Sequence, residues 1–350
     1  MDSFSSRIIA WQKHAGRHNL PWQQQVNRYR VWVSEIMLQQ TQVATVIPYF
    51  ERFMQRFPDV ESLATAPADD VLAHWAGLGY YARARNLQKA AIKVLEDFGG
   101  KMPEEADELE GLPGIGRSTA AAIVSLSDGV ALPILDGNVK RVFARHASID
   151  SWTGATKTQK QLWALAEERM PEQSARAYNQ GLMDLGSQLC TRSKPQCQLC
   201  PVAEDCLALA QGRTQELPVP KPKKSIPTKT AAFLVLLNAK GELLLQRRPP
   251  SGIWGGLWCL PQHDDLDALK ASVSVWQNDI NQIQALPTLQ HVFSHYKLTL
   301  QPYQLRLGAT SKTLTIAENS ERFVRPEMMS EYGLPAPIEK LLRKHGLHID

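Results

Sequence analysis

Four of the five cysteines in this 350-residue chain lie within seventeen residues, at Cys190, Cys197, Cys200 and Cys206. Four thiolates in one short segment can supply the outside ligand that each iron of a four-iron cluster requires. Structural zinc also accepts four cysteines, but its usual sites contain two C-x-x-C pairs, and this segment contains one. The spacing therefore favours an iron–sulfur cluster over zinc, and Cys259 is expected to be a buried structural thiol.

A glycine-containing turn, Leu112-Pro-Gly-Ile-Gly116, precedes an apolar segment with helical spacing that includes Ile123 and Val124. If Gly114 and Gly116 lie directly before the first turn of a helix, the first N–H groups of that helix and the positive end of its dipole point outward together. A phosphate oxygen is the natural ligand for such a site. A plain turn between two helices is the alternative that this pattern leaves open.

Two carboxylates occur at positions where they could act in acid–base chemistry. Asp136, in Ile134-Leu-Asp-Gly-Asn-Val139, lies at the start of an expected helix, where capping is the commoner role of an aspartate. Glu35 lies in Val31-Trp-Val-Ser-Glu-Ile-Met-Leu-Gln-Gln-Thr-Gln42, which indicates an amphipathic helix. An isolated glutamate on such a helix is usually only solvated. The residue types alone do not decide between these roles.

The elements that must position these groups divide into two kinds. From Ser3 to about Arg213, apolar residues recur at helical spacing. The following segment, Pro218–Lys229, contains four prolines and four lysines without an acid, which predicts an extended tether. We therefore predict a helical domain over 1–216, a linker over 217–230 and a second domain over 231–350.

The second domain has the pattern of a mixed α and β structure. Two β-rich runs flank the hairpin-like segment Asn238-Ala-Lys-Gly241, and Tyr296–Leu307 alternates between polar and apolar residues. Helices are expected at Leu266–Gln277 and Ile338–Lys344. The two β-rich runs are Ala232–Leu237 and Glu242–Gln246.

The bulk composition sets limits on the class of protein. A length of 350 residues with 43% hydrophobic content suggests about two domains with substantial cores. The net charge of +4 permits a polyanionic partner without requiring one. No apolar run approaches the roughly 18 residues that span a bilayer, and the first residues lack the pattern of a secretory signal. We expect a soluble cytoplasmic protein without a membrane partner.

The cysteine spacing after Asn179–Gly186, the hairpin with Asp136 and the Glu35 string together resemble the endonuclease III and MutY superfamily of DNA glycosylases. The resemblance extends from about Leu20 to Arg343. It implies an all-α helix-hairpin-helix region with one [4Fe-4S] cluster loop and an α+β Nudix-like C-terminal domain. The MutY branch implies a bacterial, monomeric repair enzyme, active at the nucleoid, that removes adenine mispaired with 8-oxoguanine or guanine in duplex DNA.

The same resemblance implies roles for the acids. Asp136 would be the catalytic carboxylate, supported by Asn138, and Glu35 would protonate the adenine ring. An acid beside the base and an anion beside C1′ meet the two needs of a step that builds oxocarbenium character. Glu35 would need an apolar setting, such as Trp32 and its neighbours, to stay protonated near neutral pH. Ser118 occupies the position of the lyase lysine in bifunctional members and of a tyrosine in many MutY proteins, which favours base removal without strand scission.

Because a base inside a duplex is out of reach, such an enzyme must flip the adenine and fill the gap. The wedge turn Gly77-Leu-Gly-Tyr-Tyr81 resembles the family's intercalating element, and Arg83 and Arg85 behind it suit phosphate contact, unless they only face solvent. Trp22 and Gln180 match positions around the adenine pocket. The implied DNA-contacting residues are Gln39, Gln40, Tyr80, Leu112, Gly114, Gly116, Ser118, Arg192 and Lys194.

In the second domain, the segment Leu244–Trp258 followed by Pro261 resembles the MutY C-terminal domain. A working Nudix hydrolase needs an acidic helix to hold magnesium, and 242–281 does not supply one. The resemblance therefore implies a recognition module, in which Phe293, Ser294 and His295 contact 8-oxoguanine. Three alternatives stay open: an endonuclease III-like lyase for oxidised pyrimidines, which Ser118 opposes; a non-catalytic iron–sulfur DNA-binding protein; and a nucleotide-pool pyrophosphohydrolase.

Overall fold

The computed structural model of the chain describes residues 3–222, 225–250, 252–274, 282–293, 295–308 and 320–347. The chain forms two compact units. One consists of Met1–Thr65 and Asn86–Lys223, and the other of Ala66–Arg85 and Lys224–Asp350. Across the described ranges, no helix has both the length and the apolar character needed to cross a membrane.

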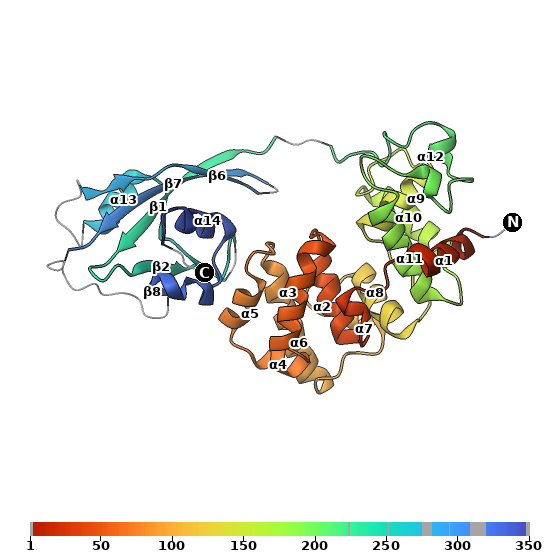
Figure 1. Cartoon of the computed structure of the whole chain (residues 1–350), viewed down its shortest axis with the longest axis horizontal. Helices are drawn as coiled ribbons and strands as arrows, with labels where there is room; N and C mark the ends of the chain where they lie inside the picture. Colours follow the sequence, from red (N-terminus) through yellow and green to blue (C-terminus); the bar gives the residue numbers. More distant parts are fainter. Residues whose placement is uncertain are drawn as a thin grey trace. The chain divides into compact units, whose positions relative to one another are not determined.

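The first unit is built from helices wherever it is described, as the apolar spacing predicted (Figure 1). Helix α6 (Ala82–Phe98) starts in the second unit and continues into the first. The other helical elements of the first unit are α1 (Phe4–Ala15), η1 (Pro21–Gln23), α2 (Arg28–Leu38), α3 (Val43–Arg56), α4 (Val60–Thr65), α7 (Ala106–Glu110), α8 (Arg117–Asp128), α9 (Gly137–His146), α10 (Thr156–Glu168), α11 (Ala175–Gln188), η2 (Cys197–Leu199) and α12 (Leu207–Ala210).

Two apolar clusters fix the helices that carry the candidate acids. In one, Val31 of α2 packs with Ala122 and Leu126 of α8 and with Ile134, two residues before Asp136. The other joins α1, α9, α10 and α11 through side chains such as Ile8, Phe143, Leu162 and Leu185. Each fully buried side chain of this size contributes roughly 1.5–3 kcal/mol. Apolar packing therefore holds α2 and the segment before α9 against α8, and holds α9 against α1, α10 and α11.

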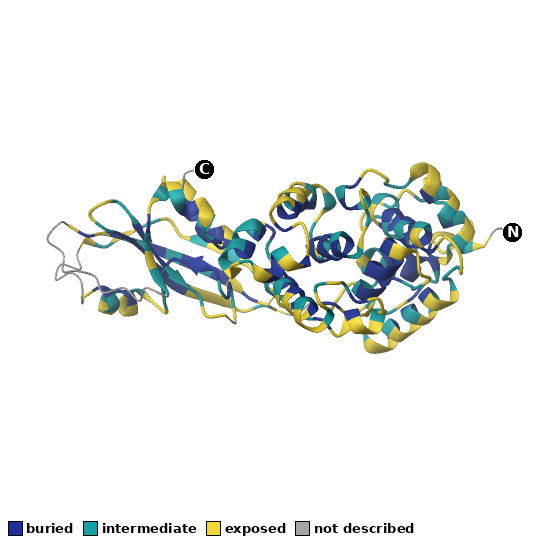
Figure 2. Cartoon of the chain, turned by 90° about the horizontal axis from the view of Figure 1, so that it is seen from below, coloured by how far each residue is buried: buried dark blue, intermediate teal, exposed yellow. Residues whose placement is uncertain are grey.

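The second unit contains one sheet, in which the run 231–237 is fully buried and other strands carry partly or fully exposed residues (Figure 2). Its path is β3-β2-β1-β7-β5, with β4 beside β1, β6 beside β7, and β8 beside β2. The strands are β1 (Thr228–Leu237), β2 (Leu243–Arg247), β3 (Trp258–Cys259), β4 (Gln262–His263), β5 (Gln284–Ala285), β6 (Leu289–Val292), β7 (Lys297–Arg306) and β8 (Glu321–Val324).

The pairing of these strands agrees with the sequence pattern. β1 and β2 form an antiparallel pair that starts at Leu237 and Leu243, so the hairpin predicted at 238–241 is confirmed. β1 and β7 run parallel over ten residues each, which places two strands distant in sequence at the centre of the sheet. Helices α13 (Leu266–Val273) and α14 (Ala336–Lys344) lie where helices were expected. The last three residues of the expected 266–277 helix are outside the described residues.

One segment joins the second unit from the helical part of the sequence. Helix α5 (Ala68–Trp75), the wedge turn and the start of α6 belong to this unit by their contacts. Helix α5 lies against η4 (Pro326–Glu331), and Trp258 donates its backbone N–H to Gly333 at 3.1 Å just after that element. This association was not predicted from the sequence.

Candidate active site and DNA interface

Glu35 lies on α2, which starts at an Asn27 cap whose side chain accepts the Arg30 N–H at 2.9 Å. Its neighbours Ile36 and Met37 are buried, and the Glu35 carboxyl is only partly accessible. Burial, and secondarily the negative charge of Asp136, raises the pKa of Glu35 to about 8. A carboxyl with this pKa carries its proton at neutral pH and can donate it to a leaving group.

Asp136 is the N-cap of α9, so the structure confirms the capping role that the sequence left open. Its carboxylate accepts the Val139 N–H at 2.7 Å and the Asn138 side-chain amide at 3.0 Å. Burial raises the pKa of Asp136, while these hydrogen bonds and the charge of Arg141 lower it. Capping does not exclude catalysis here, because Asp136 is also near enough to Glu35 to raise its pKa.

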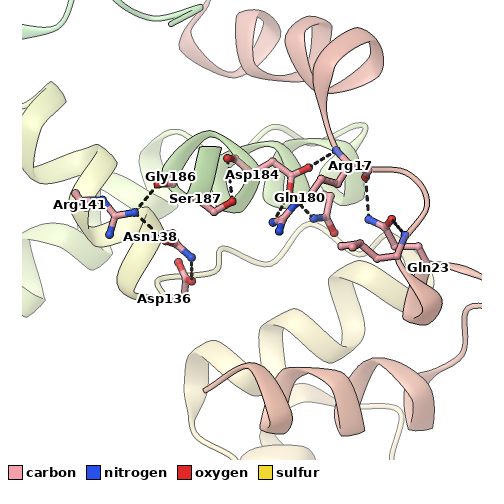
Figure 3. A network of polar contacts seen from close by, with 10 residues as sticks. Arg17, Gln23, Asp136, Asn138, Arg141, Gln180, Asp184, Gly186 and Ser187 are labelled. Carbon is pink, nitrogen blue, oxygen red and sulfur yellow. Dashed lines mark hydrogen bonds and ion pairs between the residues drawn. The ribbon is translucent and has the colours of Figure 1, made fainter. Parts of the chain in front are cut away.

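A hydrogen-bonded series leads from Asp136 through Asn138 to Arg141 (Figure 3). Arg141 donates to the Asn138 side-chain oxygen at 2.8 Å and to the Cys190 carbonyl at 2.7 Å. A Cβ on Gly186 would lie 2.6 Å from the Cβ of Asn138, so only glycine permits this approach of α11 to α9. Arg141 was missed by sequence reasoning, although its i,i+3 spacing from Asn138 places both on one helix face.

Ser118 holds the segment that leads into Asp136. Its hydroxyl accepts the backbone N–H of Leu135 at 3.0 Å. A hydroxyl in this position cannot form a Schiff base with an opened sugar. Ser118 therefore acts on the geometry of the neighbouring carboxylate, a role that the sequence did not indicate.

The glycine-containing turn joins α7 to α8. Leu112 is buried, whereas Gly114 and Gly116 are exposed. Gly114 has a φ of +80°, and a Cβ there would lie 2.9 Å from the Cβ of Asn86, so the turn requires glycine at this position. Gly116 caps α8 without a side-chain hydrogen bond, which leaves the start of this helix suited to a phosphate oxygen.

Trp22 and Gln180 line the same cavity of about 580 Å³ in the first unit. This volume is within the range of about 300–1,000 Å³ for small-molecule sites. Glu35 and Asp136 are not among the described residues that line it. Trp22 and Gln180 therefore lie in one cavity, as the resemblance implied, whereas the two acids are not among its described lining residues.

The orientation of Gln180 is fixed by a buried acid that sequence reasoning missed (Figure 3). The Gln180 amide nitrogen donates to Asp184 at 2.9 Å, one helical turn along α11. Arg17 donates to the same carboxylate from its backbone N–H at 2.8 Å and its Nε at 2.7 Å. Because a carboxylate can only accept hydrogen bonds, the amide oxygen of Gln180 is the atom directed away from Asp184.

The four clustered cysteines line one cavity with Arg145 and His146. Arg145 is almost fully buried and donates to the Cys190 sulfur at 3.3 Å, the Thr191 carbonyl at 2.7 Å and the Arg192 carbonyl at 2.9 Å. Burial raises the pKa of Cys200 to about 11, and the charges of the other thiolates add to the effect. Four thiolates together thus need a strongly cationic centre, which an iron cluster supplies.

Two further observations describe the cysteine loop. Among the residues that the structure describes, no three His, Cys, Asp or Glu side chains are arranged to hold a single metal ion. Arg192 and Lys194, which the resemblance placed against the DNA backbone, are both exposed.

Gln39 and Gln40, also expected to contact DNA, directly follow the helix that carries Glu35. Gln39 is the C-cap of α2, and Gln40 is exposed with a φ of +59°.

Comparisons with known proteins match each part of the chain. Residues 33–168 match the model of the HhH-GPD superfamily of base excision DNA repair proteins, and 190–206 match the iron-sulfur binding domain of endonuclease III. Residues 232–344 match the NUDIX domain. The adenine DNA glycosylase of Buchnera aphidicola subsp. Acyrthosiphon pisum is 36% identical over 99% of this chain and 98% of that protein. The chain belongs to the adenine DNA glycosylase family.

Other relatives support the same assignment. The human adenine DNA glycosylase is 33% identical over 97% of this chain and 73% of the human protein. The structure of a thermostable thymine-DNA glycosylase matches with a TM-score of 0.55 and 28% identity, over 59% of this chain and 95% of that one. This adenine DNA glycosylase is therefore a DNA-binding enzyme of base excision repair, and its four clustered cysteines belong to a [4Fe-4S] segment.

In the second unit of this adenine DNA glycosylase, Tyr80 projects from the wedge turn with 54% of its surface exposed. Three residues of the turn, Gly77, Gly79 and Tyr80, have positive φ. Arg83 donates to the carbonyls of Leu78 and Gly79 at 3.2 and 3.1 Å. Arg83 is buried, so the solvent-facing role considered for it is wrong, and its hydrogen bonds support the turn.

The residues expected to recognise 8-oxoguanine lie between β6 and β7. The Phe293 ring packs against Trp254, His291 and Tyr296, with centroid distances of 5.5, 4.5 and 4.8 Å. The His295 ring meets the Tyr296 ring edge to face, with a centroid distance of 4.9 Å. Ser294 is outside the described residues. Trp254 was part of the family-like segment, but its contact with Phe293 could not be inferred from the sequence.

Proposed function

We propose that this adenine DNA glycosylase removes adenine opposite 8-oxoguanine or guanine in duplex DNA, as a monomer and without cutting the strand. The observation that supports it most is the pairing of Glu35, whose pKa is raised to about 8, with Asp136, which accepts two hydrogen bonds to its charged form. One group can give a proton while the other carries a negative charge, which are the two requirements of N-glycosidic cleavage.

In the proposed reaction, the adenine leaves the duplex stack before chemistry. Glu35 donates its proton to the adenine ring, so the base departs as a neutral species and the bond to C1′ breaks. The sugar becomes cationic, and the Asp136 carboxylate stabilises that charge. Water then adds to C1′ and gives its proton to the Glu35 carboxylate, which returns Glu35 to its acid form. Asn138 and Ser118 hold Asp136 and the segment before it in place.

The other groups have binding roles in this proposal. The Gln180 amide oxygen accepts a hydrogen bond from the exocyclic amine of adenine. The α8 terminus and the exposed Arg192 and Lys194 contact phosphates, and Tyr80 fills the gap in the stack. The [4Fe-4S] cluster, when bound, holds the cysteine loop in shape for its DNA contacts. The Phe293–His295 turn recognises the 8-oxoguanine.

Single-turnover release of adenine tests the proposal directly. The protein should release adenine from duplexes with adenine opposite 8-oxoguanine and opposite guanine, and not from an adenine–thymine pair. Borohydride should trap no covalent adduct, because Ser118 supplies no amine. A trapped adduct on DNA with oxidised pyrimidines would instead identify a lyase. Binding without any base release would identify a non-catalytic DNA-binding protein.

A further inference from the structure

The wedge turn is held by the sheet domain at both of its ends. Before the turn, Asp69 at the start of α5 forms an ion pair with Arg247 on β2 at 2.6 Å. After it, the Tyr81 hydroxyl donates to the Leu334 carbonyl at 3.0 Å, and Arg85 donates to the Gly255 carbonyl at 2.6 Å. The position of the turn therefore depends on residues of the domain that matches the NUDIX model.

The packing around these contacts is close. A Cβ on Gly333 would lie 3.3 Å from the backbone of Leu72 on α5, so the helix and this segment leave no room for a larger side chain without a shift. A Cβ on Gly256 would be in ordinary contact with Leu72 and Arg85. Such packing transmits a displacement of one segment to the other, because close-packed interiors resist compression.

A short loop, Gly252–Leu257, contacts both Arg85, which follows the wedge turn, and Phe293. Its Gly255 carbonyl accepts the hydrogen bond from Arg85. The adjacent residue, Trp254, packs its ring 5.5 Å from the ring of Phe293. A Cβ on Gly255 would lie 2.7 Å from the Pro250 carbonyl oxygen, so the loop is tightly folded at this point. Gly255 of this loop thus binds Arg85 behind the wedge turn, and the preceding residue, Trp254, contacts Phe293.

We propose that the Asp69–Arg247 and Arg85–Gly255 contacts couple the wedge turn to Phe293, so that insertion of Tyr80 and recognition of the base opposite adenine occur as one event. The coupled ligand is an oxidised guanine nucleotide in the strand opposite the adenine. This inference rests on the proposed function. Asp69, Arg85 and Arg247 are positioning residues, which act on DNA through Tyr80 and Phe293.

The coupling predicts a specific effect on substrate preference. With the contacts intact, a guanine oxidised at C8 is met by both elements at once, in one geometry. With one of these contacts broken, the wedge turn loses part of its attachment to the sheet domain, and the added interaction at Phe293 orders Tyr80 less. The preference for 8-oxoguanine over guanine should then fall, because that preference requires both elements to be placed together.

An exchange of charges tests the proposal. The variants are Asp69→Arg, Arg247→Asp and the double variant, and the measurement is the ratio of single-turnover adenine release opposite 8-oxoguanine to that opposite guanine. Each single variant should lower this ratio by roughly 3- to 10-fold, a range typical of coupled residues. The double variant restores the ion pair with reversed polarity and should recover most of the loss. Because the ratio compares two duplexes, general changes in DNA attraction cancel.

A second readout reports the wedge itself. A 2-aminopurine placed beside the 8-oxoguanine should change its fluorescence when Tyr80 inserts, and this change should shrink in each single variant and return in the double variant. The matched control is reversal of Arg343 to Glu, which breaks an ion pair with Glu339 at 2.9 Å elsewhere in the same unit and at similar exposure. Arg343→Glu should leave the ratio and the fluorescence as in the parent.

The outcomes separate this inference from the function on which it rests. If the parent has no preference for 8-oxoguanine, the proposed recognition fails and the coupling fails with it. If the parent has the preference and Phe293→Ala removes it, while both charge variants keep the parental ratio, the coupling alone is wrong. Losses in the single variants that simply add in the double variant would also overturn it. A thermal melt of each variant checks that the second unit is folded.

Discussion

Asp136 lies near enough to Glu35 for its charge to raise the pKa of that carboxyl, which burial has already raised, to about 8. Burial raises the pKa of both acids, but Asp136 also accepts hydrogen bonds that favour its charged form. Protonation of Glu35 is favoured by the anion beside it, and the charged form of Asp136 is favoured by its hydrogen bonds to Val139 and Asn138. Environments that separate two carboxyls in this way define an acid and an anion in one site.

The pH dependence of adenine release should follow from this pair. Because Glu35 must hold its proton, the single-turnover rate constant should fall as pH rises through about 8. Asp136→Asn removes the neighbouring charge, which lowers the pKa of Glu35. Any residual activity should therefore begin to fall at a lower pH than in the parent. Glu35→Gln should lower the rate constant by about 10²–10⁴-fold and remove the limb. A parental rate that is constant from pH 6 to about 10 would contradict the role of Glu35 as acid.

The same pKa predicts an effect on stability. As pH rises from the ordinary value of 4.5, the unfolded chain loses the Glu35 proton while the folded chain keeps it until about pH 8. Folded protein then binds more protons, so this group lowers the free energy of unfolding by at most about 1.4 kcal/mol per pH unit in that window. Glu35→Gln should therefore gain stability relative to the parent between pH 4.5 and 8. Urea unfolding at several pH values measures the difference, and equal pH dependence in both proteins would count against the buried acid.

Ser118 should affect catalysis without contributing a nucleophile. Its hydroxyl accepts the Leu135 N–H, so Ser118→Ala leaves that donor without its partner at a cost of about 1–3 kcal/mol in unfolding free energy. We expect a lower rate of adenine release and an unchanged pH profile, because the acids themselves are intact. Ser127→Ala, on the same helix, removes a hydroxyl that donates to the Ile123 carbonyl of that helix, and it is the matched control. A Ser118→Ala rate equal to that of Ser127→Ala would remove Ser118 from the positioning of Asp136.

Local patterns predicted those parts of the structure whose cause is local. The hairpin at Asn238–Gly241 follows from a turn between two β-rich runs, and α2 follows from its apolar spacing. The contact of Asp69 with Arg247 joins residues far apart in the sequence, so no local signal assigns α5 to the second unit. For the same reason Arg83 was expected at a phosphate or in solvent, although its partners are the carbonyls of its own turn.

The active site shows the same limit. The residue types and family resemblance directed attention to Glu35 and Asp136, which the structure brings within electrostatic reach. They gave no indication of Asp184 or Arg145, because an aspartate or arginine on an amphipathic helix is ordinarily solvated. Both are buried here by contacts from other helices or loops. Burial of a charge is decided by tertiary packing, which a single sequence does not display.

Arg145 should be required for the iron–sulfur loop. It donates to two loop carbonyls and to the Cys190 sulfur from a buried position, so Arg145→Met leaves buried acceptors unsatisfied. The purified variant should contain less iron per chain and melt at a lower temperature than the parent. Arg213→Met removes an arginine whose acidic partners are exposed, and it should change neither quantity. Full iron content in Arg145→Met would show that the cysteines alone organise the loop.

Gln180 should distinguish bases by their exocyclic amine. Asp184 accepts from the Gln180 amide nitrogen, so the amide oxygen faces away as an acceptor, and adenine offers an N–H donor where purine has only C–H. Gln180→Leu should therefore slow release of adenine by about 2- to 10-fold more than release of purine, the effect of one neutral hydrogen bond. Asp184→Asn allows the amide to turn and should reduce the same selectivity. The Gln188→Leu variant, at the end of the same helix, is the control. If Gln180→Leu slows both bases equally, the residue serves packing, and its fixed orientation has no part in base selection.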